Sequence, residues 1–287
     1  MTDQAHNLRS KIERLKHNKE AKTIAIASGK GGVGKSNVTL NFALSLCKEQ
    51  KKVLIFDLDI GMGNIDILLG TPAKRTIVEM FENNLSIADI IEKGPQGLSF
   101  IAGGSGLNSL FVLNETKASH FFDQLQLLVE DYDYILFDLG AGVSEESLHF
   151  ILAANECIMV TTPEPTSITD TYAMVKHVIL QQSDLPINMV VNKSFSSKAG
   201  QQTMDRLQQV VMRFLNKEIL PLGILPDDST VTRAVSRQTP FLAYNEHAAI
   251  SKALHKMTKH YLSGKQEVHT KSKAPFISRL KRLMLER

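Results

Sequence analysis

A glycine-rich loop with a lysine and a serine is the part of this sequence best suited to chemistry. Its residues, Ser28-Gly29-Lys30-Gly31-Gly32-Val33-Gly34-Lys35-Ser36, fit the pattern Gly-x-x-x-x-Gly-Lys-Ser. Glycines let consecutive backbone N–H groups turn around an anion, and a helix that starts at the loop adds its positive end. We expect Lys35 to reach the β- and γ-phosphates and the Ser36 hydroxyl to bind Mg²⁺. The loop predicts binding of a nucleoside triphosphate. The alternative is a glycine-rich turn with a solvated lysine.

Two aspartates follow the next apolar run, which covers residues 53–56 and is typical of a buried parallel strand. Asp57 and Asp59 stand at its carboxyl end, where doubly wound sheets bind ligands. Their spacing of two places both carboxylates on one face of an extended strand. One carboxylate is expected near the metal and the other at an attacking water. For Asp57, a cap on the next helix is the alternative.

A third aspartate, Asp138, ends the apolar run 134–137 and is followed by Gly140 and Gly142. With the glycine-rich loop, this arrangement predicts the second half of a phosphate-binding site. Asp138 would hold Mg²⁺ through water, and the glycine loop would sense the γ-phosphate.

Strands and helices alternate along the rest of the chain. Strands are expected at residues 23–27, 53–56, 98–104, 134–137, 156–162, 187–193 and 220–226. Helices are expected at residues 37–44, 85–91, 117–130, 170–182 and 248–262. This order predicts an α/β fold with one doubly wound, mostly parallel sheet of the P-loop NTPase type.

The net charge of +3 is unevenly distributed. Residues 1–22 carry +3 and residues 265–287 carry +5, which leaves −5 on the middle of the chain. An acidic body disfavours general binding of nucleic acid, whereas basic ends favour acidic partners or an anionic membrane surface. The two cysteines, Cys47 and Cys157, are far apart and are expected to pack as small apolar side chains. Because no signal peptide or spanning segment is recognisable, a cytoplasmic location is expected.

The two ends of the chain have patterns of their own. Leu8, Ile12 and Leu15 form a narrow apolar stripe near the start, which indicates either a solvated leader or a short motif that becomes helical on a partner. Residues 263–274 are polar and predict a linker. Residues 275–287 predict a basic amphipathic helix whose apolar arc contains Phe276, Ile277, Leu280, Leu283 and Met284. We expect this helix to bind membranes reversibly, with two copies acting together. The alternative is a last helix packed on the core.

Three motifs together resemble those of the MinD/ParA ATPases. The glycine-rich loop resembles the deviant phosphate loop of that family, residues 57–66 resemble its switch I segment, and residues 138–142 resemble its switch II segment. The resemblance covers residues 22–262 and implies an ATP-hydrolysing switch that dimerises around ATP. It implies that Lys30 reaches the partner's phosphates, that Asp59 positions the water and that Asp57 supports the metal site. It also implies nucleotide contacts from Gly29 to Asn37 and, around adenine, from Asn192, Pro226 and Asp227.

The termini resemble those of one branch of this family, FlhG (also called YlxH or FleN), which regulates flagellar number and placement. Residues 1–21 resemble its N-terminal activator segment, in which Gln4, Leu8 and Arg9 would bind and stimulate the GTPase FlhF. The branch also has a C-terminal amphipathic helix. The resemblance implies further partners: a second copy of the chain, flagellar basal-body (C-ring) components and the inner face of the cell membrane. The alternative is a ParA-type ATPase for DNA partition, and a metabolic kinase or ligase is a third possibility.

Overall fold

The strands of this protein alternate between two apolar cores on opposite faces of one sheet. The computed structural model describes residues 20–59, 63–83, 85–103, 115–142, 144–182, 184–264 and 274–285, without the side chains of residues 115–118. In the first strand, β1 (Lys22–Ala27), Ile24 and Ile26 pack into one core, and Ala25 and Ala27 pack into the other. Successive side chains of a strand point to opposite faces, so a strand covered on both sides is apolar throughout.

The described strands form one eight-stranded sheet in the order β3-β4-β2-β5-β1-β6-β7-β8. All its neighbouring pairs are parallel except β3 with β4. The other strands are β2 (Val53–Leu58), β3 (Glu92–Lys93), β4 (Ser99–Ile101), β5 (Tyr134–Leu139), β6 (Glu156–Thr161), β7 (Ile187–Ser194) and β8 (Leu220–Pro226). The predicted doubly wound, mostly parallel sheet is therefore confirmed.

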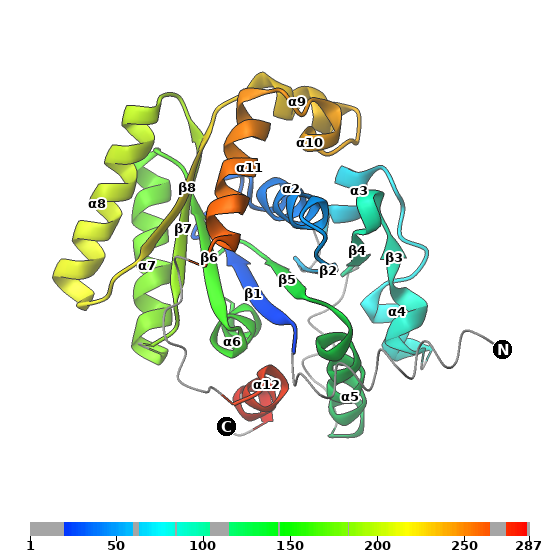
Figure 1. Cartoon of the computed structure of the whole chain (residues 1–287). Helices are drawn as coiled ribbons and strands as arrows, with labels where there is room; N and C mark the ends of the chain where they lie inside the picture. The colour runs from blue at the N-terminus through cyan, green and yellow to red at the C-terminus, as the bar shows by residue number, and fades with distance from the viewer. Residues whose placement is uncertain are drawn as a thin grey trace.

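Helices cover both faces of the sheet (Figure 1). One layer contains α2 (Lys35–Lys48), α3 (Ile65–Leu69), α9 (Ser229–Ser236), α10 (Phe241–Tyr244) and α11 (Ala249–Leu262). The other contains α4 (Ile77–Glu82), α5 (Glu115–Asp131), α6 (Glu145–Ala153), α7 (Pro165–Gln181), α8 (Ser197–Leu215) and α12 (Phe276–Leu285). Two short 3₁₀ helices, η1 (Ile87–Ile90) and η2 (Pro95–Gly97), lie before β4.

Several helices differ from the sequence-based expectation. The predicted helix at residues 85–91 is the 3₁₀ helix η1, and the helices that were not predicted are α3, α4, α6, α8, α9 and α10. Helix α7 begins at Pro165 instead of residue 170, because proline is accepted in a first turn whose N–H groups have no partner within the helix. Helix α8 is not among the predicted helices. Its buried residues, which include Gly200, Met204 and Leu207, recur every three to four positions, so the helix has a clear amphipathic pattern that the sequence-based expectation overlooked.

Candidate nucleotide-binding site

The glycine-rich loop connects β1 to α2 at the carboxyl edge of the sheet, as predicted. Gly32 and Gly34 have φ angles of +76° and +87°, which favour glycine. At Gly34 a Cβ would also lie 2.5 Å from Nδ2 of Asn192, so space and backbone conformation both require glycine. Lys35 and Ser36 are buried in the first turn of α2. The loop therefore leads into the positive end of a helix, which suits phosphate.

The end of β7 braces this loop through contacts that the sequence analysis did not identify. Asn192 donates from Nδ2 to the carbonyl of Val33 at 2.8 Å, and Lys193 donates from Nζ to the carbonyl of Gly32 at 2.7 Å. Among the described residues, Oδ1 of Asn192 is buried without a hydrogen-bond partner. Recognition of adenine by Asn192 stays a prediction. The observed role of its amide nitrogen is to hold the loop.

Helix α7 supports the loop from another side. A Cβ at Gly29 would lie 2.3 Å from the carbonyl carbon of Asp170 and 2.5 Å from the nitrogen of Thr171. Only glycine lets the two backbones approach so closely, which gives Gly29 a packing role beside its predicted contact with phosphate.

Three of the predicted site residues meet beneath the loop. Lys35 Nζ lies 2.9 Å from Oδ1 of Asp138 and 3.4 Å from Oγ of Ser36. Thr39, one helical turn after Lys35, donates to Oδ1 of Asp138 at 2.7 Å. Oδ2 of Asp138 is buried and has no hydrogen-bond partner among the described residues. Thr39 was not predicted, although its spacing of four from Lys35 on a helix could have indicated it.

Asp57 lies beside Asp138 because β2 and β5 pair in register at these two residues. Strand β2 continues to Leu58, so Asp57 is buried within it and only Asp59 lies beyond its end. Oδ1 of Asp57 accepts from the N–H of Asp59, and Oδ2 accepts from the N–H groups of Asn64 and Ile65. Burial and the charge of Asp138 raise the pKa of Asp57 to about 7. The three hydrogen bonds that its side chain accepts anchor the backbone around Asp59.

Asp59 is half-buried and faces the loop that follows β5. A Cβ at Gly140 would lie 3.3 Å from Oδ1 of Asp59, so the two segments are in close contact. The N–H of Gly142 in turn donates to the carbonyl of Ser28, at the start of the phosphate loop, at 3.0 Å. Burial raises the pKa of Asp59, and the charge of Lys35 opposes this rise. The structure thus brings Asp59, residues 138–142 and the phosphate loop together.

Lys30, the additional lysine of the loop, points to the start of α7. Its Nζ lies 3.2 Å from Oε2 of Glu164 and 2.9 Å from Oγ1 of Thr166. The side chains of Lys30 and Glu164 are 40% and 65% exposed. An ion pair this exposed contributes little stability, so Lys30 can leave it at small cost.

Comparisons with known proteins agree with this geometry. Residues 19–262 match the model of the ParA family, which is described as NUBPL iron-transfer P-loop NTPase. The chain belongs to the ParA/MinD family of P-loop NTPases. The antiactivator FleN of Pseudomonas aeruginosa is 33% identical to it over 75% of this chain and 77% of FleN. The flagellum site-determining protein YlxH of Helicobacter pylori is 33% identical over 81% and 79%. The MinD structure from Pyrococcus horikoshii, complexed with Mg-ADP, superposes with a TM-score of 0.68 at 24% identity and covers 85% and 98% of the two chains.

The remaining predicted nucleotide contacts of this ParA/MinD protein lie around the same edge of the sheet. Asn37 is half-buried in the first turn of α2, and its carbonyl accepts from the side chain of Asn41 at 2.8 Å. Pro226 ends β8, and the N–H of the exposed Asp227 donates to the carbonyl of Ser194 at 2.9 Å. The contact of Asn37 with nucleotide and those of Pro226 and Asp227 with adenine stay predictions.

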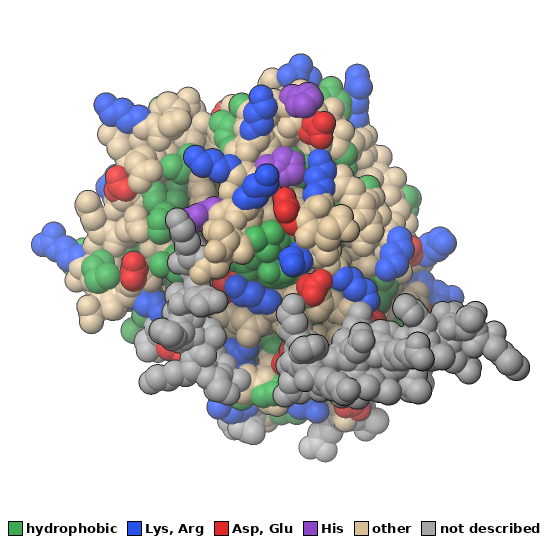
Figure 2. All heavy atoms as spheres, viewed as in Figure 1, with side chains coloured by type: hydrophobic (Ala, Val, Ile, Leu, Met, Phe, Trp, Pro, Cys, Tyr) green, Lys and Arg blue, Asp and Glu red, His purple; other side chains and the backbone are tan. Residues whose placement is uncertain are grey.

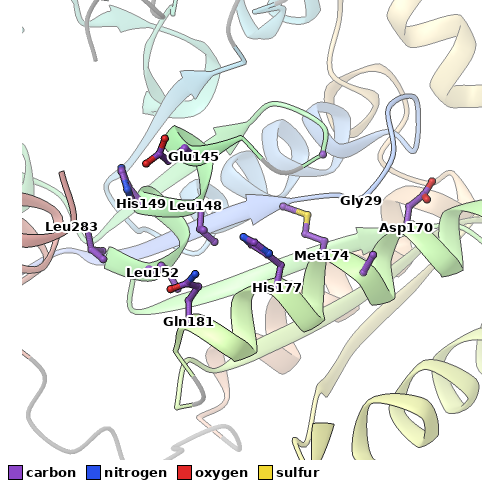
Figure 3. Close-up of a pocket in the computed structure, with 12 residues that line it drawn as sticks. Gly29, Glu145, Leu148, His149, Leu152, Asp170, Met174, His177, Gln181 and Leu283 are labelled. Atoms are coloured by element: carbon purple, nitrogen blue, oxygen red, sulfur yellow. The ribbon is translucent and has the colours of Figure 1, made fainter. Parts of the chain in front are cut away.

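A groove of about 790 Å³ runs between α6 and α7, beside the phosphate loop. In Figure 3, Gly29 and Asp170 mark one end and Leu283 of α12 marks the other. His149 and His177 line its walls from the two helices. The groove therefore extends from the phosphate loop of this ParA/MinD protein to its C-terminal helix.

Helix α12 is present, as predicted, and it packs on α6 and α5. Of the residues predicted to contact membrane, Phe276, Ile277 and Leu280 are buried in this packing. Leu283 and Met284 are partly buried against the same core. The alternative of a last helix packed on the core thus describes the observed position, and membrane binding by this apolar arc requires the helix to leave it.

The predicted activator residues, Gln4, Leu8 and Arg9, and most of the predicted linker lie outside the described residues. In the described part of the chain, no helix combines the length and the apolar character that crossing a membrane requires.

Proposed function

We propose that this chain is a Mg²⁺-dependent ATPase that acts as a slow molecular switch. The observation that supports this most directly is the meeting of Lys35, Ser36 and Asp138 beneath the glycine-rich loop, with Asp59 at its side. The loop residues would bind the phosphates through backbone N–H groups, and Lys35 would add its positive charge.

The donor set at this site fits a hard divalent cation. The hydroxyl of Ser36 and the carboxylate of Asp138 are oxygen ligands, and Oδ2 of Asp138 lacks a hydrogen-bond partner among the described residues. Ser36 would hold Mg²⁺ directly and Asp138 through water, while Asp57 would support the site by fixing the segment around Asp59. When bound, the ion neutralises charge on the transferred phosphoryl group.

Asp59 would hold the attacking water. Its carboxylate lies beside Gly140. Of the three aspartates, Asp57 and Asp138 are buried and Asp59 is only half-buried. The carboxylate would accept a hydrogen bond from the water, which orients it, and would take its proton as attack proceeds. Because Asp59 touches residue 140, rearrangement of residues 138–142 would change its position and couple hydrolysis to the state of the switch.

Closure of an ATP-dependent homodimer would complete the site. Lys30 would exchange its exposed contacts with Glu164 and Thr166 for the phosphates bound by the partner subunit. The dimer would then present two α12 helices to an anionic membrane, so the protein would be cytoplasmic and reversibly peripheral on the inner face of the cell membrane. Slow hydrolysis would return it to the monomer.

The cellular output would be control of flagellar number and placement. This assignment rests on the relatives FleN and YlxH, whose names refer to an antiactivator and to flagellum site determination. The ATPase would carry flagellar basal-body (C-ring) components to the assembly site. Its residues 1–21 would bind an FlhF-type GTPase, with Gln4 ordering the attacking water in that partner. Gln4→Ala should blunt GTPase stimulation and leave the ATPase rate unchanged, and a normal GTPase rate would count against the motif.

DNA partition is the second candidate, and one observation favours it. Helix α11 contains no acidic residue and exposes Lys252, Lys256 and Lys259. Figure 2 shows lysine and arginine side chains gathered over this helix, with acidic side chains between them. A basic surface attracts nucleic acid, although the mixed charges make the attraction weaker than that of a continuous basic stripe.

One sedimentation experiment separates the two candidates. The protein is offered vesicles of phosphatidylglycerol and phosphatidylethanolamine, or plasmid DNA, with ATP and Mg²⁺ or with ADP. We expect ATP-dependent capture by vesicles, lost on deleting residues 275–287 while the far-UV spectrum and thermal transition stay native. Lys35→Ala serves as the control that cannot bind ATP. Capture by DNA alone would overturn the flagellar and membrane assignment in favour of partition.

A further inference from the structure

The docked face of α12 is apolar and well packed at its start. The ring of Phe276 stacks on that of Phe137, with centroids 5.2 Å apart, and Leu280 is fully buried. Phe137 directly precedes Asp138, so α12 contacts the strand that carries the predicted metal ligand. This packing is what a helix held in a specific position requires.

Arg279 is the exception on this face. It is only 6% exposed, and its Nη1 donates to the carbonyl of Ala154, at the end of α6, at 3.0 Å. Nε and Nη2 are buried and have no hydrogen-bond partner among the described residues. Burial lowers the pKa of the guanidinium, and the charges of Asp184 and Glu20 offset this effect in part. A guanidinium carries five N–H donors, so most of its hydrogen-bonding capacity is unused where α12 is docked.

A buried cation without full hydrogen bonding raises the free energy of the state that buries it. In α12, Arg279 lies one turn from Phe276 and one turn from Leu283, at the edge of the apolar arc. At a bilayer surface, an arginine at the edge of such an arc extends its head to the lipid phosphates while its stem stays apolar. Guanidinium and phosphate form paired, charge-assisted hydrogen bonds. The same side chain that fits the docking site poorly thus fits an anionic lipid surface well.

We propose that Arg279 makes the docking of α12 releasable, and that lipid phosphate is the partner that completes its hydrogen bonds after release. Only the second half of this inference, the contact of Arg279 with lipid phosphate, rests on the proposed membrane function. Its first half, the weakening of docking by Arg279, concerns the protein in the absence of any membrane. Arg279 therefore sets how easily the helix exchanges its position on α6 for a position on a bilayer.

The first test measures docking without membrane. Amide hydrogen exchange of α12 is followed in the full-length, nucleotide-free protein, because an isolated helix of this length is marginal in water and its protection reports docking. Arg279→Met is compared with Arg282→Met, since Arg282 is exposed on the same helix and arginine and methionine have similar helix propensities. We expect Arg279→Met to slow exchange of α12 by about fivefold or more, as when buried ions are replaced by apolar groups, and Arg282→Met to change it less than about twofold. Unchanged or faster exchange in Arg279→Met, with core amides of β1 unaffected, would overturn the proposal.

The second test measures capture by phosphatidylglycerol vesicles in the presence of ATP and Mg²⁺. Both variants lose one positive charge and should lose similar electrostatic attraction. We expect Arg279→Met to lose several-fold more binding than Arg282→Met, because only the former stabilises the docked helix. Equal losses would contradict the role of Arg279. Absence of wild-type binding would contradict the membrane function, and the exchange measurement would still decide whether Arg279 weakens docking.

A third arm separates lipid phosphate from free phosphate. Inorganic phosphate at the concentration of the vesicle headgroups is expected to leave exchange of α12 unchanged, because it provides no apolar layer for Phe276 and Leu280. Acceleration of exchange by inorganic phosphate alone would overturn the assignment of lipid as the partner.

Discussion

The phosphate-binding edge of the sheet and the docking face of α12 each bury a basic side chain, but they stabilise it to different degrees. Lys35 lies 2.9 Å from the carboxylate of Asp138 and 3.4 Å from the hydroxyl of Ser36. Arg279 has one hydrogen bond, to a backbone carbonyl, and two buried nitrogens without a partner among the described residues. The two sites are linked through β5, which places Phe137 against α12 and Asp138 against Lys35.

This difference indicates that the nucleotide site keeps its geometry and that α12 can leave its position. A buried ion pair with hydrogen bonds keeps its geometry, since removing either partner leaves an uncompensated charge. A guanidinium with unused donors favours any state in which those donors find acceptors. We infer that the nucleotide site is preorganised, whereas α12 is held mainly by apolar packing and can be released.

Removing the cation from the paired site should have the largest effect. Lys35→Ala is expected to abolish ATP binding and to lower the free energy of unfolding by about 3 kcal/mol at neutral pH, because Asp138 is left buried beside Asp57 without a counter-charge. Calorimetric titration with ATP and urea denaturation measure the two effects. Adding Asp138→Asn to Lys35→Ala should recover part of the stability but none of the binding. Wild-type affinity in Lys35→Ala would remove the assignment of the loop.

Asp59 tests whether catalysis can be separated from this charge pairing. Asp59→Ala should bind ATP, accumulate dimer and hydrolyse ATP on the order of 10³-fold more slowly, since a positioned proton acceptor contributes about that much. Single-turnover hydrolysis and analytical ultracentrifugation with ATP measure rate and dimer. Asp205→Ala, an exposed aspartate on α8, is the matched control. Unchanged turnover in Asp59→Ala would assign the water to another group.

The sheet and most of the site could be predicted because their signals are local. The loop from Gly29 to Ser36, and the aspartates that end or follow apolar runs, are contiguous patterns that identify a phosphate site and the strands that carry it. Lys35, Ser36 and Asp138 meet as expected because parallel strands bring their carboxyl ends to one edge.

The contacts that could not be predicted join segments far apart in the chain. Asn192 braces Val33 across 159 residues, and Gly29 packs on the backbone of Asp170. The docking of α12 belongs to the same class, since an amphipathic helix has the same pattern whether its apolar face meets a bilayer or a protein core. Arg279 is one of the basic residues of this amphipathic helix, and only its neighbours in space make it a buried cation.

Loss of apolar packing should release α12 without disturbing the nucleotide site. Phe276→Ala removes the stack on Phe137 and is expected to raise amide exchange of α12 on the order of 100-fold, because truncating a buried Phe costs about 3 kcal/mol. ATP affinity should stay within about twofold of wild type. Leu285→Ala, at an exposed position of the same helix, is the control and should change neither quantity. If Phe276→Ala weakened ATP binding tenfold, α12 would be part of the nucleotide site and the contrast between the two regions would fail.

The smallest expected effect concerns the balance of charge within the paired site, where one lysine faces two carboxylates. Burial and the charge of Asp138 raise the pKa of Asp57 from 3.8 to about 7. Between these values the folded state holds a proton that the unfolded state has released, so the stability of the nucleotide-free protein should fall as pH rises from about 4 to about 7. The fall should be modest, because Lys35 and the backbone N–H groups that bind Asp57 favour its charged form. Urea denaturation at several pH values measures this slope. Asp57→Asn should flatten it, and Asp205→Asn should leave it unchanged. An equal slope in Asp57→Asn would mean that Asp57 does not cause the slope and that Lys35 compensates both carboxylates. The charges of the site would then be more fully balanced than the raised pKa of Asp57 implies.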